Sequence, residues 1–295
     1  DAYGPIDEGD ALKLIDYAVQ VGITTFDTAP LYGHGRAESL VGQGIASYQD
    51  RGAMTLIGKV GQPRSGVYEW DVPVLTRSLE DTLCRLQTTY LDVLLLHSPD
   101  LNTLRHADAV FSFLHDRATD GTIRTYGVAA RSPEDGVLVI HRWDVPVVEV
   151  NLSLADHRAI DCGLLDLADE RGVGIIARTP LCYGYLSGQL TGTERWPSAD
   201  HRNEIGMERK VLWTSIANVF EDMAVRRQST LAQFALQFCS DHPSVSTVVP
   251  GMLRVDDVRD NATVSMLPPL SRADYSEIRD RYRQYVLGLT VEACA

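Results

Sequence analysis

The chain has 295 residues, of which 44% are hydrophobic and 23% are charged, and its formal net charge is -13. This length suits a single α/β barrel, and the composition supports a sizeable core rather than a disordered chain. The acidic balance argues against binding to a nucleic-acid backbone, because no basic stripe is available to replace counterions. A membrane-spanning role is not expected either, since no apolar run approaches about 20 residues, and no signal peptide is visible.

Helical and strand patterns alternate along the chain. The first helical stripe of apolar residues runs from Ala11 to Val19, and Gly22 is expected to end that helix. The segments SLEDTLCRLQ and CGLLDLADERG repeat this pattern. Runs such as LDVLLLH and VPVVEV are almost continuously apolar, which is typical of strands buried on both faces of a parallel sheet. The predicted strands are residues 23–28, 54–60, 91–97, 124–129, 145–151, 173–179 and 245–250.

Units of strand, helix and strand, each of about 30 residues, predict right-handed βαβ connections and a parallel sheet. The seven predicted strands are one fewer than a closed barrel needs. We therefore expect an α/β fold, a (β/α)8 TIM barrel whose first strand lies upstream of Asp1 or is absent from this chain, with an open sheet as the alternative. No linker or low-complexity segment interrupts the series, so residues 1–295 are expected to form one barrel domain.

The cysteine pattern bears on the compartment. The five cysteines are odd in number and widely spaced, and no CxxC pair occurs. Neither a disulfide framework nor a zinc site is indicated, so we expect no metal ion and a reducing, cytoplasmic location. The cysteines are Cys84, Cys162, Cys182, Cys239 and Cys294.

Three successive strands end in ionisable residues of different types. These are Asp27, Lys59 and His97, and the catalytic residues of barrel enzymes stand at the carboxyl ends of strands. Each has an ordinary reading alone: the aspartate as a turn cap, the lysine as a solvated side chain and the histidine as a structural residue. Their coincidence in consecutive units favours a shared site.

Tyr32 follows the first of these strands and supplies a proton donor. We expect a neighbouring lysine ammonium to lower the pKa of its phenol, which is ordinarily near 10. In this reading Asp27 keeps Lys59 charged and aimed, and His97 orients a substrate oxygen. The four residues together suit protonation of an oxygen that gains negative charge, as when a carbonyl receives hydride.

At this point the sequence resembles the aldo-keto reductase superfamily. The phrases that carry the resemblance are GITTFDTAPLYG, LIGKVG, LDVLLLHSP, GTIRTYGVAARSPEDG, VGIIARTPLCYGYLSG and VSTVVPGMLRVDDVRDN, in the family's order across nearly the whole chain. The resemblance implies a catalytic tetrad of Asp27, Tyr32, Lys59 and His97. It also implies a nicotinamide cofactor, with NADPH expected and NADH as the alternative, held without a Rossmann domain; the weak glycine pattern in GHGRAE is broken at Glu38.

The resemblance also implies where the cofactor lies. After the last strand, a helix start offers free N–H groups to a phosphate, and Arg254 could pair with it; the alternative is a surface arginine paired with acidic neighbours. Thr179 and Leu181 are expected to line the cofactor too. The positions implied near the adenosine and its phosphate are Gly251, Arg254, Asp257, Asp260 and Asn261.

Several positions depart from the family pattern around the nicotinamide. Ala129 and Ala130 replace a serine and an asparagine, so recognition of the carboxamide depends more on Glu149, which replaces a glutamine. Arg178 replaces an aromatic residue and either covers the nicotinamide ring or pairs with Glu149. Asp257 replaces an arginine or glutamine and makes the preference for NADPH less secure.

The loops after the strands are expected to shape a substrate pocket. Tyr68, Trp70, Asn151 and Tyr183 are the candidates, although plain loop packing is the ordinary reading of each. Aromatic and polar side chains together favour a sugar-like, polyol or natural-product carbonyl, with an aromatic aldehyde as the alternative.

The principal hypothesis is an NAD(P)H-dependent oxidoreductase that reduces an aldehyde or ketone to an alcohol, with Tyr32 as general acid. One alternative is a cofactor-binding regulatory barrel without significant turnover. Another is a barrel recruited to non-redox biosynthetic chemistry. The expected partner is a small carbonyl compound, without nucleic acid or membrane, and oligomeric state is left open.

Overall fold

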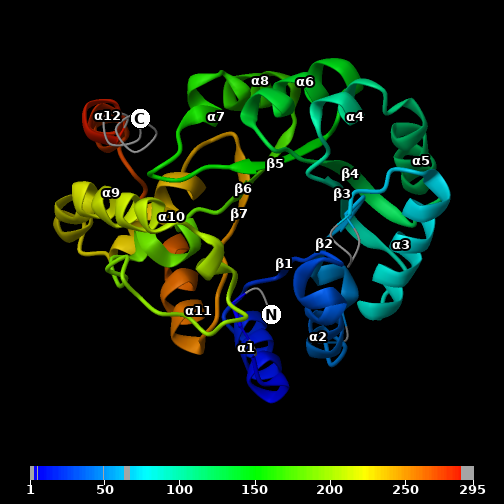
Figure 1. Ribbon diagram of the computed structural model, residues 1–295, viewed down its shortest axis with the longest axis horizontal. Helices are drawn as coiled ribbons and strands as arrows, with labels where there is room; N and C mark the ends of the chain where they lie inside the picture. Colours follow the sequence, from blue (N-terminus) through cyan, green and yellow to red (C-terminus); the bar gives the residue numbers. More distant parts are fainter. Residues whose placement is uncertain (1–2, 5, 49, 63–66, 287–295) are drawn as a thin grey trace.

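The computed structural model describes residues 3–4, 6–48, 50–62 and 67–286, and in them seven strands form one parallel sheet in the order β1 to β7. Every predicted strand is confirmed, with ends that differ by at most two residues. Figure 1 shows the strands at the centre of the molecule and the helices around them. The strands are β1 (Thr25–Asp27), β2 (Thr55–Val60), β3 (Leu91–His97), β4 (Ile123–Ala129), β5 (Val147–Asn151), β6 (Gly174–Arg178) and β7 (Val245–Val249).

The sheet is a nearly closed barrel. Each strand pairs in parallel with the next in sequence, from β1 with β2 through β6 with β7. In the described residues β1 and β7 are the two ends of this sheet. The expected α/β class with barrel architecture is therefore confirmed, and the strand count within the described part of the chain is the seven that the sequence predicts.

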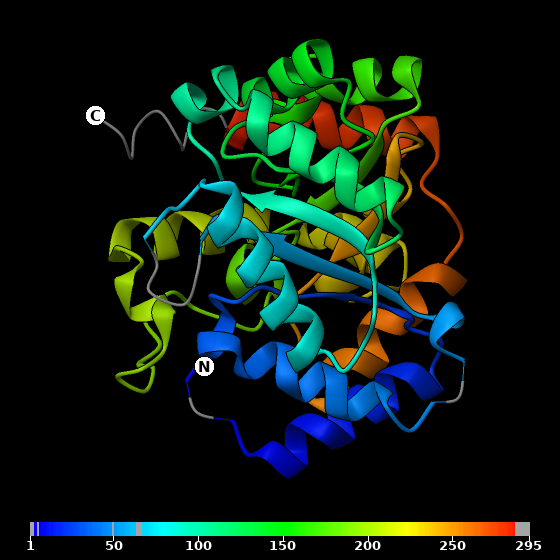
Figure 2. The same cartoon turned by 90° about the vertical axis from the view of Figure 1, so that its right-hand side faces the viewer.

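Helices cover the outside of the sheet, as Figures 1 and 2 show from two directions. The predicted first helix is confirmed; Asp7 caps its start by accepting from the amide of Asp10, and Gly22 follows its end with a φ of 93°. None of the described helices is long and apolar enough to cross a bilayer. The helices are α1 (Glu8–Gln20), α2 (Arg36–Ile45), α3 (Val72–Arg85), α4 (Leu101–Arg105), α5 (Asp108–Thr119), α6 (Pro133–Trp143), α7 (Arg158–Asp161), α8 (Leu164–Arg171), α9 (Met207–Arg226), α10 (Leu231–Ser240), α11 (Val255–Ala262) and α12 (Arg272–Arg281).

Two apolar layers hold the barrel together. The larger lies between the sheet and the helices and includes Leu94, Leu96, Val148 and Phe238. The smaller fills the barrel interior, because side chains in a strand alternate between the two faces of a sheet. Its members are Ile57, Val93, Leu95, Ala129 and Ile176, with Val147 and Val249 packed against them.

Candidate active site

A polar layer lies above the apolar interior of the barrel. Four strands carry an ionisable residue two positions after an interior apolar residue, and an interval of two returns the side chain to the same face of the sheet. These four side chains therefore face the same opening at the carboxyl ends of the strands, from β2, β3, β5 and β6. The pairs, apolar residue first, are Ile57 and Lys59, Leu95 and His97, Val147 and Glu149, and Ile176 and Arg178.

Lys59 is the centre of this layer. Its side chain is fully buried, and its Nζ lies 2.5 Å from both carboxylate oxygens of Asp27 at the end of β1. The same Nζ lies 3.3 Å from Oε2 of Glu149 on β5. Burial lowers the pKa of Lys59, but the charges of Asp27 and Glu149 outweigh it and hold the pKa above its usual value. The ammonium is thus kept charged, as expected, but by two carboxylates instead of one.

Tyr32 lies in a short 3₁₀ segment, Tyr32–Gly35, between β1 and α2. The chain turns there through positive φ angles at Gly33 and His34, of 58° and 54°, a conformation that L residues other than Asn, Asp and His seldom adopt. The ring is 5.4 Å from Nζ of Lys59 and stands edge-on to His97, with 5.9 Å between ring centres. The structure therefore brings the four tetrad residues of the prediction into one cluster.

The pKa expected for Tyr32 is wrong in direction. Burial, with the carboxylates of Asp27 and Glu149, raises its pKa to about 12, although the charge of Lys59 opposes them. Sequence reasoning counted the lysine and missed the burial and the second carboxylate. The phenol is accordingly fully protonated at neutral pH, the form that a proton donor needs.

His97 is a neutral imidazole in this setting. Only 7% of the residue is exposed, and burial followed by the charges of Lys59 and Arg178 lowers its pKa to about 3. A neutral ring keeps one N–H donor and one acceptor nitrogen. His97 is thus able to hold a substrate oxygen in position without competing with Tyr32 as the acid.

The positions that depart from the family pattern meet beside this cluster. Ala129 and Ala130 are buried and bring no polar side chain, and the amide of Ala130 donates to the carbonyl of Glu149. Arg178 donates from its terminal nitrogen to the carbonyl of Ala130 at 3.1 Å, and its Nε lies 3.8 Å from Oε1 of Glu149. Of the two readings for Arg178, pairing with Glu149 describes its position here.

A groove of about 1110 Å³ runs from β6 to α11 and contains most of the predicted cofactor positions. Because it joins two strand ends and a helix start, it offers a path for an extended ligand along the end of the barrel. Ala129, Glu149 and Arg178 lie at the barrel opening instead. The predicted residues that line the groove are Thr179, Leu181, Gly251, Arg254, Asp257, Asp260 and Asn261, with Tyr183 from the substrate set.

Arg254 and Asp257 pair with each other at the start of α11. The guanidinium NH2 group of Arg254 lies 2.8 Å from Oδ1 of Asp257, and Oδ2 of Asp257 accepts the backbone amide of Arg254 at 3.0 Å. Asp260 accepts from Thr230 and Gln233 of the neighbouring helix start. The alternative of a surface arginine with acidic neighbours therefore describes Arg254 as it stands.

The predicted substrate residues fall into two groups. Tyr68 and Trp70 stack with 6.0 Å between ring centres, and the guanidinium of Arg131 lies over Tyr68 at 4.7 Å. Asn151 accepts a hydrogen bond from Thr179 at 3.2 Å, which ties β5 to the groove. Tyr183 lies in the groove, edge-on to His201, and not beside Trp70.

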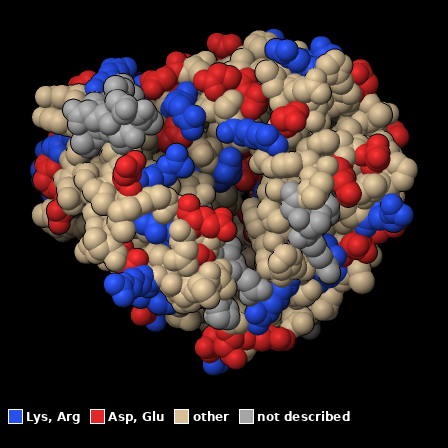
Figure 3. All heavy atoms as spheres, in the orientation of Figure 1, with Lys and Arg blue, Asp and Glu red and all other residues tan. Residues whose placement is uncertain are grey.

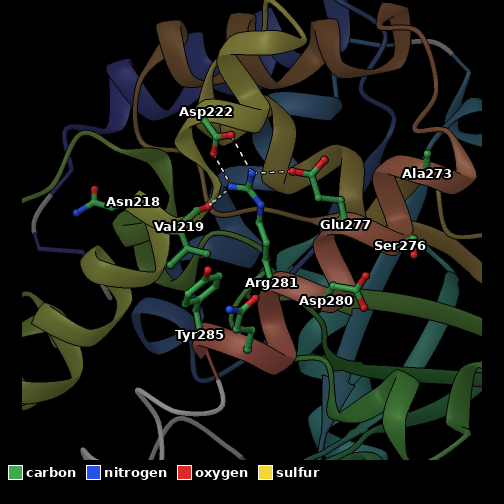
Figure 4. Close-up of a pocket in the computed structure, with 10 residues that line it drawn as sticks. Asn218, Val219, Asp222, Ala273, Ser276, Glu277, Asp280, Arg281 and Tyr285 are labelled. Atoms are coloured by element: carbon green, nitrogen blue, oxygen red, sulfur yellow. Dashed lines mark hydrogen bonds and ion pairs between the residues drawn. The ribbon is translucent and has the colours of Figure 1, made fainter.

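Figure 3 shows a hollow at the centre of the ring of strands, with Lys and Arg side chains along its upper rim. A second cavity, of about 890 Å³, lies between α9 and α12 on the outside of the barrel (Figure 4). There Arg281 is paired with Asp222 and Glu277, so its charge is already balanced. The outer cavity holds no group of the tetrad and is a packing gap between two helices.

Sequence reasoning missed two buried partners. Glu38, at which the glycine pattern of GHGRAE is broken, lies in the first turn of α2 and is buried in an ion pair with Arg85 at 2.6 Å. Glu149 was expected to meet the cofactor or Arg178, and its contact with Lys59 was not foreseen. The signal for that contact was available, since Glu149 is an acid in an otherwise apolar strand and such a group needs a cation.

The parallel, nearly closed barrel with a polar layer at the carboxyl ends of its strands places the chain in the class of α/β-barrel proteins. The family model for the aldo/keto reductase family matches residues 1–283. The chain belongs to this family. Membership, which the predicted resemblance anticipated, supports an oxidoreductase that acts on small carbonyl compounds.

Individual relatives agree with this membership. The chain is 27% identical over 274 residues to L-galactose dehydrogenase of Arabidopsis thaliana, covering 91% of this chain and 82% of the relative. It is 29% identical over 269 residues to L-glyceraldehyde 3-phosphate reductase of Escherichia coli O157:H7, covering 83% and 75%. The holo form of an aldo-keto reductase from Bacillus halodurans superposes with a TM-score of 0.77 at 26% identity, covering 95% and 89%.

A further solved structure bears on the fold alone, because its identity is only 24%. It is an aldo/keto reductase from Klebsiella pneumoniae in complex with NADP and acetate, with a TM-score of 0.71 over 95% of this chain and 88% of that one.

Proposed function

We propose that the protein is an NAD(P)H-dependent reductase that converts an aldehyde or ketone to an alcohol, with Tyr32 as general acid. The observation that carries the proposal is the cluster of Tyr32, Lys59, Asp27 and His97 at the barrel mouth, all in the charge states that the reaction needs. Lys59 is held 2.5 Å from Asp27, and Tyr32 and His97 stand edge-on at 5.9 Å.

Each side chain has a separate task in this proposal. His97, being neutral, donates a hydrogen bond that orients the carbonyl oxygen beside the phenol of Tyr32. Tyr32 gives its proton to that oxygen as negative charge develops there. The ammonium of Lys59 stabilises the phenolate left behind, and Asp27 fixes its direction. Reduced nicotinamide, when bound, supplies the hydride that the carbonyl carbon accepts.

Several features support a nicotinamide cofactor in the groove. Seven of the predicted contact positions line it, from Thr179 near β6 to Asn261 in α11. At the mouth, Oε2 of Glu149 is buried and, beyond its 3.3 Å ion pair with Lys59, accepts no hydrogen bond from the described residues, so an amide N–H of the nicotinamide has an acceptor there. Arg254 favours a 2'-phosphate and hence NADPH. Because Asp257 already pairs with Arg254, NADH is kept as the second candidate cofactor.

The substrate that we propose is a sugar-like or polyol-derived carbonyl compound. The relatives bear names of enzymes for L-galactose and L-glyceraldehyde 3-phosphate. L-Galactose joins a carbonyl with several hydroxyl groups, and L-glyceraldehyde 3-phosphate joins one with a hydroxyl group and a phosphate ester. The stacked rings of Tyr68 and Trp70 provide an apolar wall of the kind on which a sugar ring packs. The Lys and Arg side chains along the upper rim of the hollow (Figure 3) favour an anionic form of such a substrate.

A paired experiment tests this function. Titration of the purified protein with NADPH and NADH, followed by fluorescence, measures cofactor binding. Turnover is then measured as loss of reduced nicotinamide with aldoses, phosphorylated aldehydes and aromatic aldehydes. Binding with turnover on a carbonyl compound is the expected result. Binding without turnover would favour a regulatory barrel, and failure to bind either cofactor would contradict the proposal and favour non-redox chemistry.

A further inference from the structure

We propose that Arg131 is a specificity-determining residue that binds a carboxylate or phosphate group of the substrate, away from the reacting carbonyl. The proposal rests on the reductase function given above and deepens it, because it assigns a charge to the substrate. It is carried by the place of Arg131 at the barrel mouth, by the contacts that fix its guanidinium and by the lack of a close carboxylate among the described residues.

Arg131 stands at the same opening as the tetrad. It lies two residues beyond Ala129, which ends β4 and pairs in register with His97 at the end of β3. Nε of Arg131 donates to the carbonyl of Ser98, the residue directly after His97, at 2.6 Å. The side chain thus reaches from the end of one strand to the end of its neighbour. A group bound by its tip lies at the mouth, outside the layer of side chains that surrounds the reacting atoms.

Two contacts hold the guanidinium of Arg131 in place. Besides the bond to Ser98, its central carbon lies 4.7 Å from the ring centre of Tyr68, in the loop after β2. Tyr68 in turn stacks on Trp70. A guanidinium over an aromatic face keeps its charge and gives up side-chain freedom before any ligand arrives. Arg131 is therefore preorganised beside the aromatic wall on which a sugar ring packs.

No carboxylate of the described residues lies within ion-pair distance of Arg131. Its printed contacts are the carbonyl of Ser98 and the ring of Tyr68. The charge of Arg131 helps to lower the pKa of Asp100, so this acid is the nearest negative group. Oδ1 of Asp100 accepts the amide of Thr103 as the cap of α4, however, and is fixed there.

The contrast with two other arginines supports the assignment. Arg178 has Glu149 at 3.8 Å, and Arg254 has Asp257 at 2.8 Å. Arg131 instead uses Nε for a neutral carbonyl oxygen. Its two terminal nitrogens form the planar fork that pairs with two oxygens of a carboxylate or a phosphate. The residue is exposed, so a ligand entering the mouth can reach this fork.

The overall charge of the protein makes a local cation necessary for such a substrate. A net charge of -13 repels anions, and positive side chains at the entrance offset that repulsion where the ligand binds. The substrate class that follows is a polyhydroxylated aldehyde or ketone with a carboxylate or a phosphate ester remote from its carbonyl group. Sugar phosphates and sugar acids share this chemistry.

Calorimetric titration tests the proposal without turnover. The ligands are glucitol, glucitol 6-phosphate and gulonate, the alcohols that glucose, glucose 6-phosphate and glucuronate would give. Each is titrated into the cofactor-free protein and into the protein with NADPH. The wild type should bind at least one anionic alcohol about 10-fold to 100-fold more tightly than glucitol, and the tighter of the two identifies the anion. Arg131→Gln should bring this preference close to one, and Arg131→Lys should retain part of it.

Arg171→Gln is the matched control. Arg171 is an exposed arginine at the end of α8, just before β6 begins, and so at the opposite end of the barrel. Its loss should leave the preference unchanged, and circular dichroism shows whether each variant is folded. A wild type that binds neither anionic alcohol more tightly than glucitol would overturn the proposal. A folded Arg131→Gln protein that keeps the preference would overturn it too.

Steady-state kinetics with the three parent sugars separates binding from a merely structural role. Arg131→Gln should raise KM for the anionic sugar with kcat nearly unchanged, and should leave both constants for glucose as they are, because Arg131 does not touch the reacting atoms. Equal losses with charged and neutral sugars would contradict the proposal. A protein that prefers the anionic alcohols but reduces no carbonyl compound would refute the reductase function and leave Arg131 as an anion-binding residue.

Discussion

Lys59→Met removes the one ammonium that two buried carboxylates share, while nearly keeping the length and volume of the side chain. The ammonium lies 2.5 Å from Asp27 and 3.3 Å from Glu149 and is fully buried. Removing one partner of a buried ion pair costs about 3–5 kcal/mol. For a chain of this size, each kcal/mol lowers the melting temperature by roughly 2–4 °C, so a loss of about 6–20 °C at neutral pH is expected.

The pH dependence of this loss has a defined sign. Burial already raises the pKa of Asp27 to about 7, against the opposing charge of Lys59, and loss of the ammonium removes that opposition and raises it further above its unfolded value. The folded variant then binds more protons than the unfolded chain, so its stability relative to the wild type improves as pH falls. Thermal unfolding followed by circular dichroism at about pH 7 and about pH 5 measures both effects.

A neutralising triple variant is the control. Adding Asp27→Asn and Glu149→Gln to Lys59→Met removes the unpaired charges and should recover part of the lost melting temperature. A Lys59→Met protein as stable as the wild type at neutral pH would refute the view that Lys59 balances two buried acids. A loss that grows at acid pH would refute it equally.

Two further predictions concern the cofactor groove and the barrel mouth. Asp257→Asn frees Arg254 from its ion pair and should raise the affinity for NADPH relative to NADH several-fold in fluorescence titrations. Arg254→Ala should lower the same ratio of affinities. An unchanged ratio in both variants would show that neither residue meets the 2'-phosphate. Gly61→Ala puts a Cβ 2.0 Å from the ring of Trp70 at a φ of +95°, and should lower stability and raise KM for the carbonyl compound. Gly121→Ala is the control, because Gly121 also has a positive φ, of +83°, but its added Cβ would have no atom within 4 Å. This change should cost only about 1–2 kcal/mol of backbone strain. Equal effects of the two changes on KM would contradict a role for Trp70 at the mouth.

Much of the fold could be predicted from the sequence because parallel strands are buried on both faces and read as continuous apolar runs. The cluster of Asp27, Lys59 and His97 could be predicted for a related reason. All three end a strand, and strand ends of a barrel meet at one opening. Position along the chain is then sufficient to bring them together, and no distance needs to be known.

What could not be predicted depends on distances across the barrel. The approach of Glu149 on β5 to Lys59 on β2 joins strands that are not neighbours in the sheet, so no pairing rule reveals it. The raised pKa of Tyr32 follows from burial first, and then from the charges of Asp27 and Glu149. The pairing of Arg254 with Asp257 was foreseen as one of two readings, and only the geometry of the helix start decides between them.

The most direct test of the account is the rate of a single turnover in Tyr32→Phe. A preformed complex of the protein with NADPH is mixed rapidly with a saturating carbonyl substrate. Tyr48→Phe serves as the control, because Tyr48 is a partly exposed tyrosine whose hydroxyl donates to the carboxylate of Asp16 in α1. Loss of a general acid should slow the step by about 10²–10⁴-fold without changing the affinity for NADPH. Tyr32→Phe with the rate of Tyr48→Phe would contradict the assignment of the proton donor.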